Sequence, residues 1–190
     1  ILNAIKDGEL DAVPVFVGSD KAAAKGLRTA ASLGVPTRVF SYIELGKADA
    51  EEAIALAVEE AGADWIVLAG FMRILSPDFV RRFAGRIINI HPALLPLFPG
   101  AHGIRDAWDA GVPETGVTIH IVDEEVDHGP ILAQESVKRE PEDTIETLEA
   151  KIHAVEHKLY KKTPKAVPYT HLPPPKQPAG DLARGAAHSN

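Results

Sequence analysis

Short apolar runs rich in β-branched residues alternate with helix-like segments along most of this chain. The expected strands cover residues 13–17, 35–40, 65–69, 86–90, 115–122 and 131–137. Residues with helical spacing or helix-capping character lie between the first five of these strands and again after the last. Such alternation is typical of βαβ units, whose strands are parallel and whose helices cover both faces of one sheet. We therefore expect an α/β fold with an open, mostly parallel, twisted sheet of the Rossmann-like kind.

Local patterns add detail to this expected fold. Ser76-Pro77-Asp78 supplies an N-cap, a proline in the first turn and an early acid, and so predicts the start of a short helix. Ser19 or Asp20 is expected to cap the first complete helix. The close spacing of the strands at 115–122 and 131–137 predicts an antiparallel pair near the C-terminal part of the chain.

The chain has 190 residues, of which 45% are hydrophobic, and this is enough for one good-sized core. We expect residues 1–160 to form this single domain. Residues 161–190 are rich in proline, including Pro173-Pro174-Pro175, and we expect them to form a mobile tail. The apolar spacing of Ile1 to Gly8 resembles the latter half of a helix, so a preceding strand is expected.

Composition excludes several classes of chemistry. The absence of cysteine excludes disulfides, thiolate nucleophiles and cysteine metal sites, and it fits a reducing, cytoplasmic environment. A formal net charge of −7 argues against a general nucleic-acid binder but leaves small anionic substrates open. No apolar run approaches the roughly 20 residues of a membrane-spanning helix. Any chemistry must therefore come from His, Asp, Glu, Asn, Lys or backbone groups.

Polar side chains gather at the end of the 86–90 strand. Asn89 and His91 share one face, because alternate residues of a strand point to the same side. Pro92 cannot continue a central ladder, which places the pair at the carboxyl end of the strand, where open α/β sheets bind ligands. Asp127 precedes a turn-forming His-Gly-Pro sequence, and His120 alternates with apolar residues so that it faces the same cleft. We predict that Asn89, His91 and Asp127 form a catalytic site, with His120 behind them.

A further histidine pattern, His153-Ala154-Val155-Glu156-His157, matches the H-x-x-E-H helix motif of a class of zinc peptidases. Such a site needs another ligand, usually an acid well downstream, yet the only acid after His157 is Asp181. We interpret this segment as a solvated helix face and expect no metal site.

Three separated motifs match a known family pattern. They are Gly70-Phe71-Met72-Arg73-Ile74-Leu75-Ser76, Asn89-Ile90-His91-Pro92-Ala93-Leu94-Leu95-Pro96, and the stretch from Thr118 to Pro130. On these residues the chain resembles the folate-dependent formyltransferases, and among them the phosphoribosylglycinamide formyltransferases. The likeness extends from about Leu2 to Tyr160.

The resemblance implies transfer of a formyl group from 10-formyltetrahydrofolate to the amino group of glycinamide ribonucleotide, a step of purine biosynthesis. It implies that Asn89 and His91 stabilise an oxyanion while Asp127 orients His91. Residues expected around the folate are Phe71, Met72, Arg73, Ile74, Leu75, Glu124 and Asp127, and those expected at the nucleotide are Met72 and Glu156. These small molecules would be the partners of a monomer or homodimer, with no nucleic acid, membrane or metal involved.

Members of this family open with a strand and a glycine- and serine-rich loop that binds the substrate phosphate at a helix N-terminus. No such segment is present in this sequence, so we expect the first strand and the phosphate loop to be missing and the domain to be N-terminally incomplete. Two alternatives stay open. One is a formyltetrahydrofolate deformylase, which admits water where the amine would bind, and the other is an inactive, folate-binding remnant.

Overall fold

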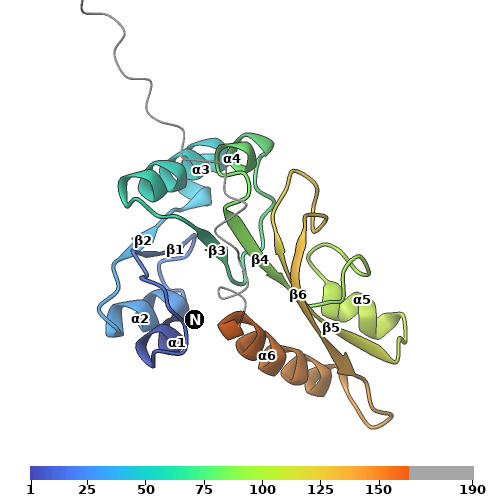
Figure 1. Ribbon diagram of the computed structural model, residues 1–190. Coiled ribbons are helices and arrows are strands. Elements are labelled where there is room, and N and C mark those ends of the chain that lie inside the picture. The colour runs from blue at the N-terminus through green and yellow to red at the C-terminus, as the bar shows by residue number, and fades with distance from the viewer. Residues whose placement is uncertain (163–190) are drawn as a thin grey trace, which may run out of the picture.

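The computed structural model of this chain describes residues 1–162. Helices and strands alternate along it (Figure 1). The helices are α1 (Leu2–Lys6), α2 (Lys25–Ser32), α3 (Tyr42–Glu60), α4 (Pro77–Arg82), α5 (Gly103–Asp109) and α6 (Ile145–Lys162). The strands are β1 (Val17–Ser19), β2 (Thr37–Val39), β3 (Ile66–Leu68), β4 (Ile87–His91), β5 (Glu114–Ile121) and β6 (Ile131–Lys138).

The strands of the described residues form two sheets (Figure 1). β1 and β2 make a parallel pair, and the larger sheet has the order β3-β4-β5-β6. In the larger sheet β3 and β4 are parallel, whereas β4 pairs antiparallel with β5 and β5 antiparallel with β6. The expected α/β fold and its antiparallel pair near the C-terminal part are confirmed. Antiparallel pairing begins one strand earlier than the sequence predicted.

Two hydrophobic clusters cover opposite faces of β4. Ile88 belongs to a buried cluster with Leu148 and Ile152 of α6, whereas Ile87 belongs to a cluster with Phe79 and Phe83, at α4. Because alternate residues of a strand point to the same side, the odd-numbered polar residues of β4 lie on the face that carries α4. Ile88 therefore packs toward α6, whereas Asn89 and His91 lie on the opposite face of β4 together with Ile87.

The first expected strand, at residues 13–17, is wrong over most of its length. β1 begins only at Val17, whose N–H donates to the Pro36 carbonyl at 2.9 Å. Pro14 has no N–H to offer a neighbouring strand, and Val13 is 86% exposed. The apolar run therefore lies outside the sheet and leads into it.

The expected helix cap at Ser19 or Asp20 is also wrong, because α2 begins at Lys25. The Ser19 hydroxyl accepts instead from the N–H of Lys21, and the carboxylate of Asp20 binds Arg73. Both side chains thus have hydrogen-bond partners other than the N-terminus of α2.

Other local predictions are confirmed. The Ser76 hydroxyl accepts from the N–H of Phe79 at 3.2 Å, and Pro77 is the first residue of α4. Leu148, Ile152 and Leu159 of α6 are buried. α3 begins at Tyr42 and is interrupted at Gly46, where φ is 77°.

The expected tail, residues 161–190, falls almost entirely outside the described part of the chain. Within residues 1–162, no helix combines the length and apolar character that crossing a bilayer requires.

Candidate active site

The predicted residues of β4 and β5 meet because of the register between these strands. Asn89 lies directly opposite His120, and His91 directly opposite Thr118. Directly opposed residues of an antiparallel pair place their side chains on the same face, about 5 Å apart. Residue pairing alone therefore brings the amide, both imidazoles and the Thr118 hydroxyl to one corner of the sheet.

His91 is 3% exposed and both of its ring nitrogens have neighbours. Nε2 lies 2.8 Å from the carbonyl oxygen of Phe98, and Nδ1 lies 3.3 Å from Oδ2 of Asp127. A carbonyl oxygen can only accept, so Nε2 carries a hydrogen in this arrangement. Nδ1 is therefore the ring nitrogen that faces the carboxylate.

The side chain of Asn89 contacts the ring of His120, and a backbone carbonyl fixes the other nitrogen of that ring. His120 places Nδ1 at 2.9 Å from the carbonyl of Ile121, which makes Nδ1 a donor, and Nε2 at 3.3 Å from Nδ2 of Asn89. In the neutral ring Nε2 accepts from the Asn89 amide, and in the imidazolium it donates to Asp127, whose Oδ1 is 3.4 Å away. His120 therefore contacts the Asn89 amide from the neighbouring strand, and its role behind the catalytic residues stays a prediction.

Asp127 is the point where these contacts converge. Its Oδ2 accepts from the N–H of Gly100 at 2.7 Å, and its Oδ1 lies 3.5 Å from Nδ2 of Asn89. Burial would raise the pKa of this carboxyl, but hydrogen bonds from His120 and Gly100 and the positive charge of His91 bring the pKa below its usual value. Asp127 is thus ionised at neutral pH.

The contacts from Asp127 to Nδ1 of His91 and to Nδ2 of Asn89 are long for hydrogen bonds, at 3.3 and 3.5 Å. Donors held this loosely in a free enzyme can tighten on a substrate oxygen. The corner therefore offers two N–H donors and one carboxylate to a small polar group.

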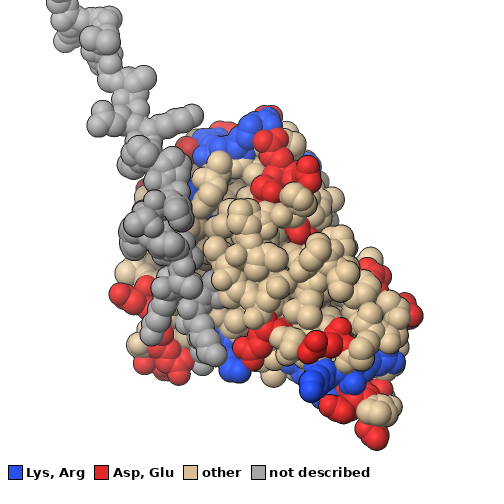
Figure 2. All heavy atoms as spheres, turned by 45° about the vertical axis from the view of Figure 1, so that its right-hand side comes forward, with Lys and Arg blue, Asp and Glu red and all other residues tan. Residues whose placement is uncertain are grey.

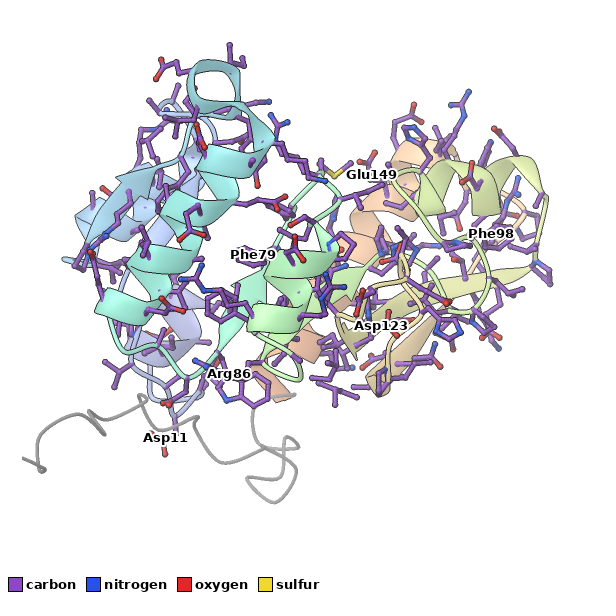
Figure 3. The ribbon with its side chains drawn as sticks, turned by 90° about the horizontal axis from the view of Figure 1, so that it is seen from above. Asp11, Phe79, Arg86, Phe98, Asp123 and Glu149 are labelled. Carbon is purple, nitrogen blue, oxygen red and sulfur yellow. The ribbon has the colours of Figure 1, made fainter. Side chains whose placement is uncertain are left out.

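Backbone groups and packing residues that the sequence did not reveal complete this corner. Phe98 and Asp127 are the non-glycine residues with positive φ, at 56° and 55°, and both touch His91. Phe98 lies in the loop beside α5, and Asp123 marks the segment that follows β5 (Figure 3). A Cβ on Gly103 would lie only 3.0 Å from Nε2 of His91, so a glycine here lets α5 approach the ring closely.

Thr118 holds the chain that leaves β4. Its buried hydroxyl donates to the Ala93 carbonyl at 2.7 Å and accepts from the N–H of Leu95 at 3.0 Å and from Nε2 of Gln134 at 2.9 Å. Thr118 lies two residues before His120 and therefore shares its face of the strand. This spacing could have identified Thr118 from the sequence.

The 70–76 loop, which contains the predicted folate residues, connects β3 to α4. Because β3 and β4 are parallel, this loop leaves the sheet at the same edge as His91. Met72 and Ile74 are 70% and 67% exposed, whereas Leu75 packs against the cluster under α4. The predicted residues Phe71 to Leu75 thus form a surface segment next to the end of β4 that carries Asn89 and His91.

The other predicted binding residues lie around this edge. Glu124, in the segment after β5, has its side chain bound to Arg81 of α4. Glu156, on α6, receives a hydrogen bond from Nδ1 of His153 at 2.6 Å. One turn further along α6, the Tyr160 hydroxyl donates to the carbonyl of Leu68 at the end of β3, so α6 reaches the start of the 70–76 loop.

Within residues 1–162, no cluster of three or more His, Cys, Asp or Glu side chains is arranged to hold a metal ion. The pKa of His153 is raised, chiefly by its hydrogen bond to Glu156 and against the effect of burial, and Glu149 adds to the rise. The H-x-x-E-H segment is thus occupied by ion pairs along one helix.

Comparison with known proteins agrees with this geometry. Residues 1–163 match the family of formyl transferases. The chain belongs to this family. It is 39% identical over 163 residues to phosphoribosylglycinamide formyltransferase of Bacillus subtilis, which covers 84% of this chain and 83% of that protein. The resemblance inferred from the three motifs is therefore confirmed.

Longer relatives also match. The trifunctional purine biosynthetic protein adenosine-3 of Gallus gallus is 43% identical over 161 residues, which cover 84% of this chain but only 16% of that protein. This formyl transferase chain thus spans about one sixth of that multifunctional relative.

Solved structures of the family share the fold. The crystal structure of phosphoribosylglycinamide formyltransferase from Bacillus halodurans has a TM-score of 0.82 and 43% identity, covering 85% of this chain and 84% of that one. The enzyme of the same name from Streptococcus pneumoniae has a TM-score of 0.80 and 45% identity, with 87% and 91% covered.

Proposed function

We propose that this formyl transferase moves the formyl group of 10-formyltetrahydrofolate to the amino group of glycinamide ribonucleotide. The observation that carries the proposal is the convergence of Asn89, His91 and Asp127 at one edge of the sheet. Relatives that match this chain over most of both lengths bear the name phosphoribosylglycinamide formyltransferase, which supports this choice of substrate.

The donors of the corner suit an acyl transfer that proceeds by direct attack of the amine. As the amine nitrogen bonds to the formyl carbon, the carbonyl electron pair moves onto oxygen, and Nδ2 of Asn89 and protonated Nδ1 of His91 donate to that oxyanion. Donors directed at a developing oxyanion are typically worth a factor of about 100 to 1,000 in rate each. Asp127 stabilises the imidazolium throughout.

The proton balance of the reaction requires a base, and we assign this second role to Asp127. The attacking nitrogen must lose one proton, and the folate nitrogen that leaves must gain one. The ionised carboxylate of Asp127 is the nearest base in the corner, and it can pass the proton on directly or through a water molecule. The net reaction then consumes no proton, and His91 is returned in its charged form.

The surroundings of the corner fit the two substrates. Exposed apolar side chains of the 70–76 loop, Met72 and Ile74, offer contact area for a flat ring system, and backbone groups of Arg73, Leu75, Glu124 and Asp127 would provide polar contacts. Glu156, on α6, would bind the hydroxyl groups of the ribose.

A formyl-transfer assay with and without glycinamide ribonucleotide tests this function. We expect folate to be consumed only when the nucleotide is present. Release of formate without the nucleotide would instead indicate a deformylase, and folate binding without turnover would indicate an inactive remnant.

His91→Asn tests the assigned mechanism. The change removes the charged donor, so we expect kcat to fall on the order of a thousandfold, while the affinity for the folate stays close to that of the wild type. His128→Asn is a matched control, because the His128 side chain is 71% exposed and pairs only with surface acids of its own loop among the described residues. An unchanged rate in His91→Asn would end the assignment.

A further inference from the structure

We propose that Asp20, Tyr42 and Glu51 are positioning residues that hold the 70–76 loop in the conformation that receives the folate. The inference rests on the proposed function for the identity of the ligand. Its structural part, a loop held in shape by side chains from two other elements, rests on contacts alone.

The loop has little packing of its own. Its backbone turns at Gly70, where φ is 66°, and two of its apolar side chains, Met72 and Ile74, point mostly to solvent. An exposed segment with few buried contacts is expected to open locally at a small free-energy cost. Contacts from outside the loop are therefore needed to give it one conformation.

Arg73 provides the first such contact. Its Nε and Nη2 lie 3.1 and 2.8 Å from the same oxygen, Oδ2 of Asp20, in the turn after β1. The Arg73 guanidinium also lies over the ring of Tyr42, 4.2 Å from its centre, at the start of α3. The middle of the loop is thus fixed between an anion on one side and an aromatic face on the other.

Glu51 provides the second contact, at the end of the loop. This carboxylate is only 4% exposed, and its two oxygens lie 3.3 and 3.2 Å from the backbone N–H of Ser76. Lys47 lies 3.9 Å away as a partial counter-charge. A buried carboxylate is costly unless it is paired or hydrogen-bonded, so its place here ties α3 to the last residue of the loop.

Tyr42 contributes through its ring, not its hydroxyl. The side chain is 9% exposed, and its hydroxyl has no hydrogen-bond partner in the described part of the chain. Burial, followed by the charge of Glu51, raises the pKa of Tyr42 to about 12, so the ring stays neutral. The face that Arg73 contacts therefore does not change with pH in the physiological range.

The arrangement also joins the two sheets. Asp20 follows β1 of the small sheet, whereas Arg73 follows β3 of the large sheet. Figure 3 shows α4, marked by Phe79, between α3 and the segments marked by Phe98 and Asp123. The contact of Asp20 with Arg73 joins the turn after β1 to the loop after β3, so the conformation of the loop depends on both sheets.

A small set of variants separates a positioning role in the loop from an effect on the stability of the whole domain. Asp20→Asn removes the charge with little change of shape. Tyr42→Leu removes the aromatic face, while Tyr42→Phe keeps it and removes only the unpartnered hydroxyl. Glu60→Gln is a control for Asp20→Asn, because it breaks an ion pair with Arg38 that does not involve the loop, although the Glu60 side chain is more exposed than that of Asp20, at 68% against 27%.

The experiment uses the whole chain and two measurements. Isothermal titration with 10-formyltetrahydrofolate alone reports affinity, and amide hydrogen exchange of residues 70–76 reports the order of the loop. Asp20→Asn and Tyr42→Leu should raise the Kd on the order of tenfold, since the apparent Kd rises in proportion as the fraction of chains with a binding-competent loop falls, and should speed exchange in the loop. Tyr42→Phe and Glu60→Gln should match the wild type, and kcat at saturating folate should change less than twofold.

Wild-type affinity in both Asp20→Asn and Tyr42→Leu would overturn the proposal, and so would weaker binding without faster exchange in the loop. A wild-type chain that binds no folate would contradict the proposed function as well. Folate binding by the wild-type chain is measured before any variant is made. A failure of the proposed function is therefore distinguishable from a failure of the positioning role.

Discussion

The catalytic corner, formed by Asn89, His91, His120 and Asp127, and the 70–76 loop lie at the same edge of the sheet but are held in different ways. The two imidazoles of the corner are almost fully buried, with His91 and His120 at 3% and 1% exposure, and Asn89 and Asp127 are partly buried. Their partners are one another and nearby backbone groups. The loop is held by Arg73, whose side chain is 39% exposed and whose anionic partner Asp20 is 27% exposed.

This difference matches the demands of each region. Buried hydrogen bonds are strong and fix geometry, which an oxyanion site requires, but each one leaves a costly unsatisfied group when broken. Exposed ion pairs are weak and are screened by salt, so a loop held by them can adjust when a large ligand arrives. One face of the molecule is mostly uncharged between groups of both signs (Figure 2).

The largest effect is expected from Thr118→Val, which disrupts the buried support of the corner. The change leaves the Ala93 carbonyl and the Leu95 N–H without their partner, and we expect the free energy of unfolding to fall by about 2 kcal/mol. Thr115→Val is the matched control on the same strand, because the Thr115 hydroxyl is buried without a partner in the described chain. Urea denaturation should show Thr115→Val as neutral or slightly stabilising; equal losses in both variants would contradict the assigned role.

A smaller effect is expected from Gly103→Ala. The new methyl group would lie 3.0 Å from Nε2 and 3.2 Å from Cε1 of His91, so the ring must shift by a few tenths of an ångström. We expect kcat to fall on the order of tenfold with little change in folate affinity, because the donor geometry is disturbed and the loop is not. Gly26→Ala, at an open position of α2, should leave kcat unchanged and serves as the control.

The smallest effect concerns acid stability. The pKa of Asp127 is lowered in the folded protein, so its stabilising contribution is fully present above about pH 4, the ordinary value of the unfolded chain. It is lost as the pH falls through the lower pKa of the folded state. The free energy of unfolding should therefore decrease more steeply below pH 4 in the wild type than in Asp127→Asn. Parallel curves would show that the corner does not depend on this charge, and Asp109→Asn, on the exposed surface, is the control.

Part of the site could be predicted from the chain because it depends on local periodicity. The alternation along residues 87–91 places Asn89 and His91 on one face, and Pro92 marks the end of the strand. The Ser76-Pro77-Asp78 pattern predicted the start of α4 in the same way. These features depend on neighbours only a few positions away.

Other parts could not be predicted because they depend on contacts between distant segments. Asp20 and Arg73 are 53 positions apart, and the sequence had assigned Asp20 to a helix cap. The groups of Phe98 and Gly100 that touch His91 and Asp127 belong to the backbone, which every residue possesses. Burial of Glu51 likewise follows from how α3 packs on the 70–76 loop, and no sequence pattern indicates it.

Phe98 and Asp127 adopt left-handed backbone conformations on either side of His91. Non-glycine residues in this region are disfavoured by about 1 to 3 kcal/mol each, and glycine at either position would relax the backbone. Variants selected only for thermal resistance should therefore accumulate changes here at the expense of turnover. At these two positions, changes that raise thermal stability are therefore expected to lower activity.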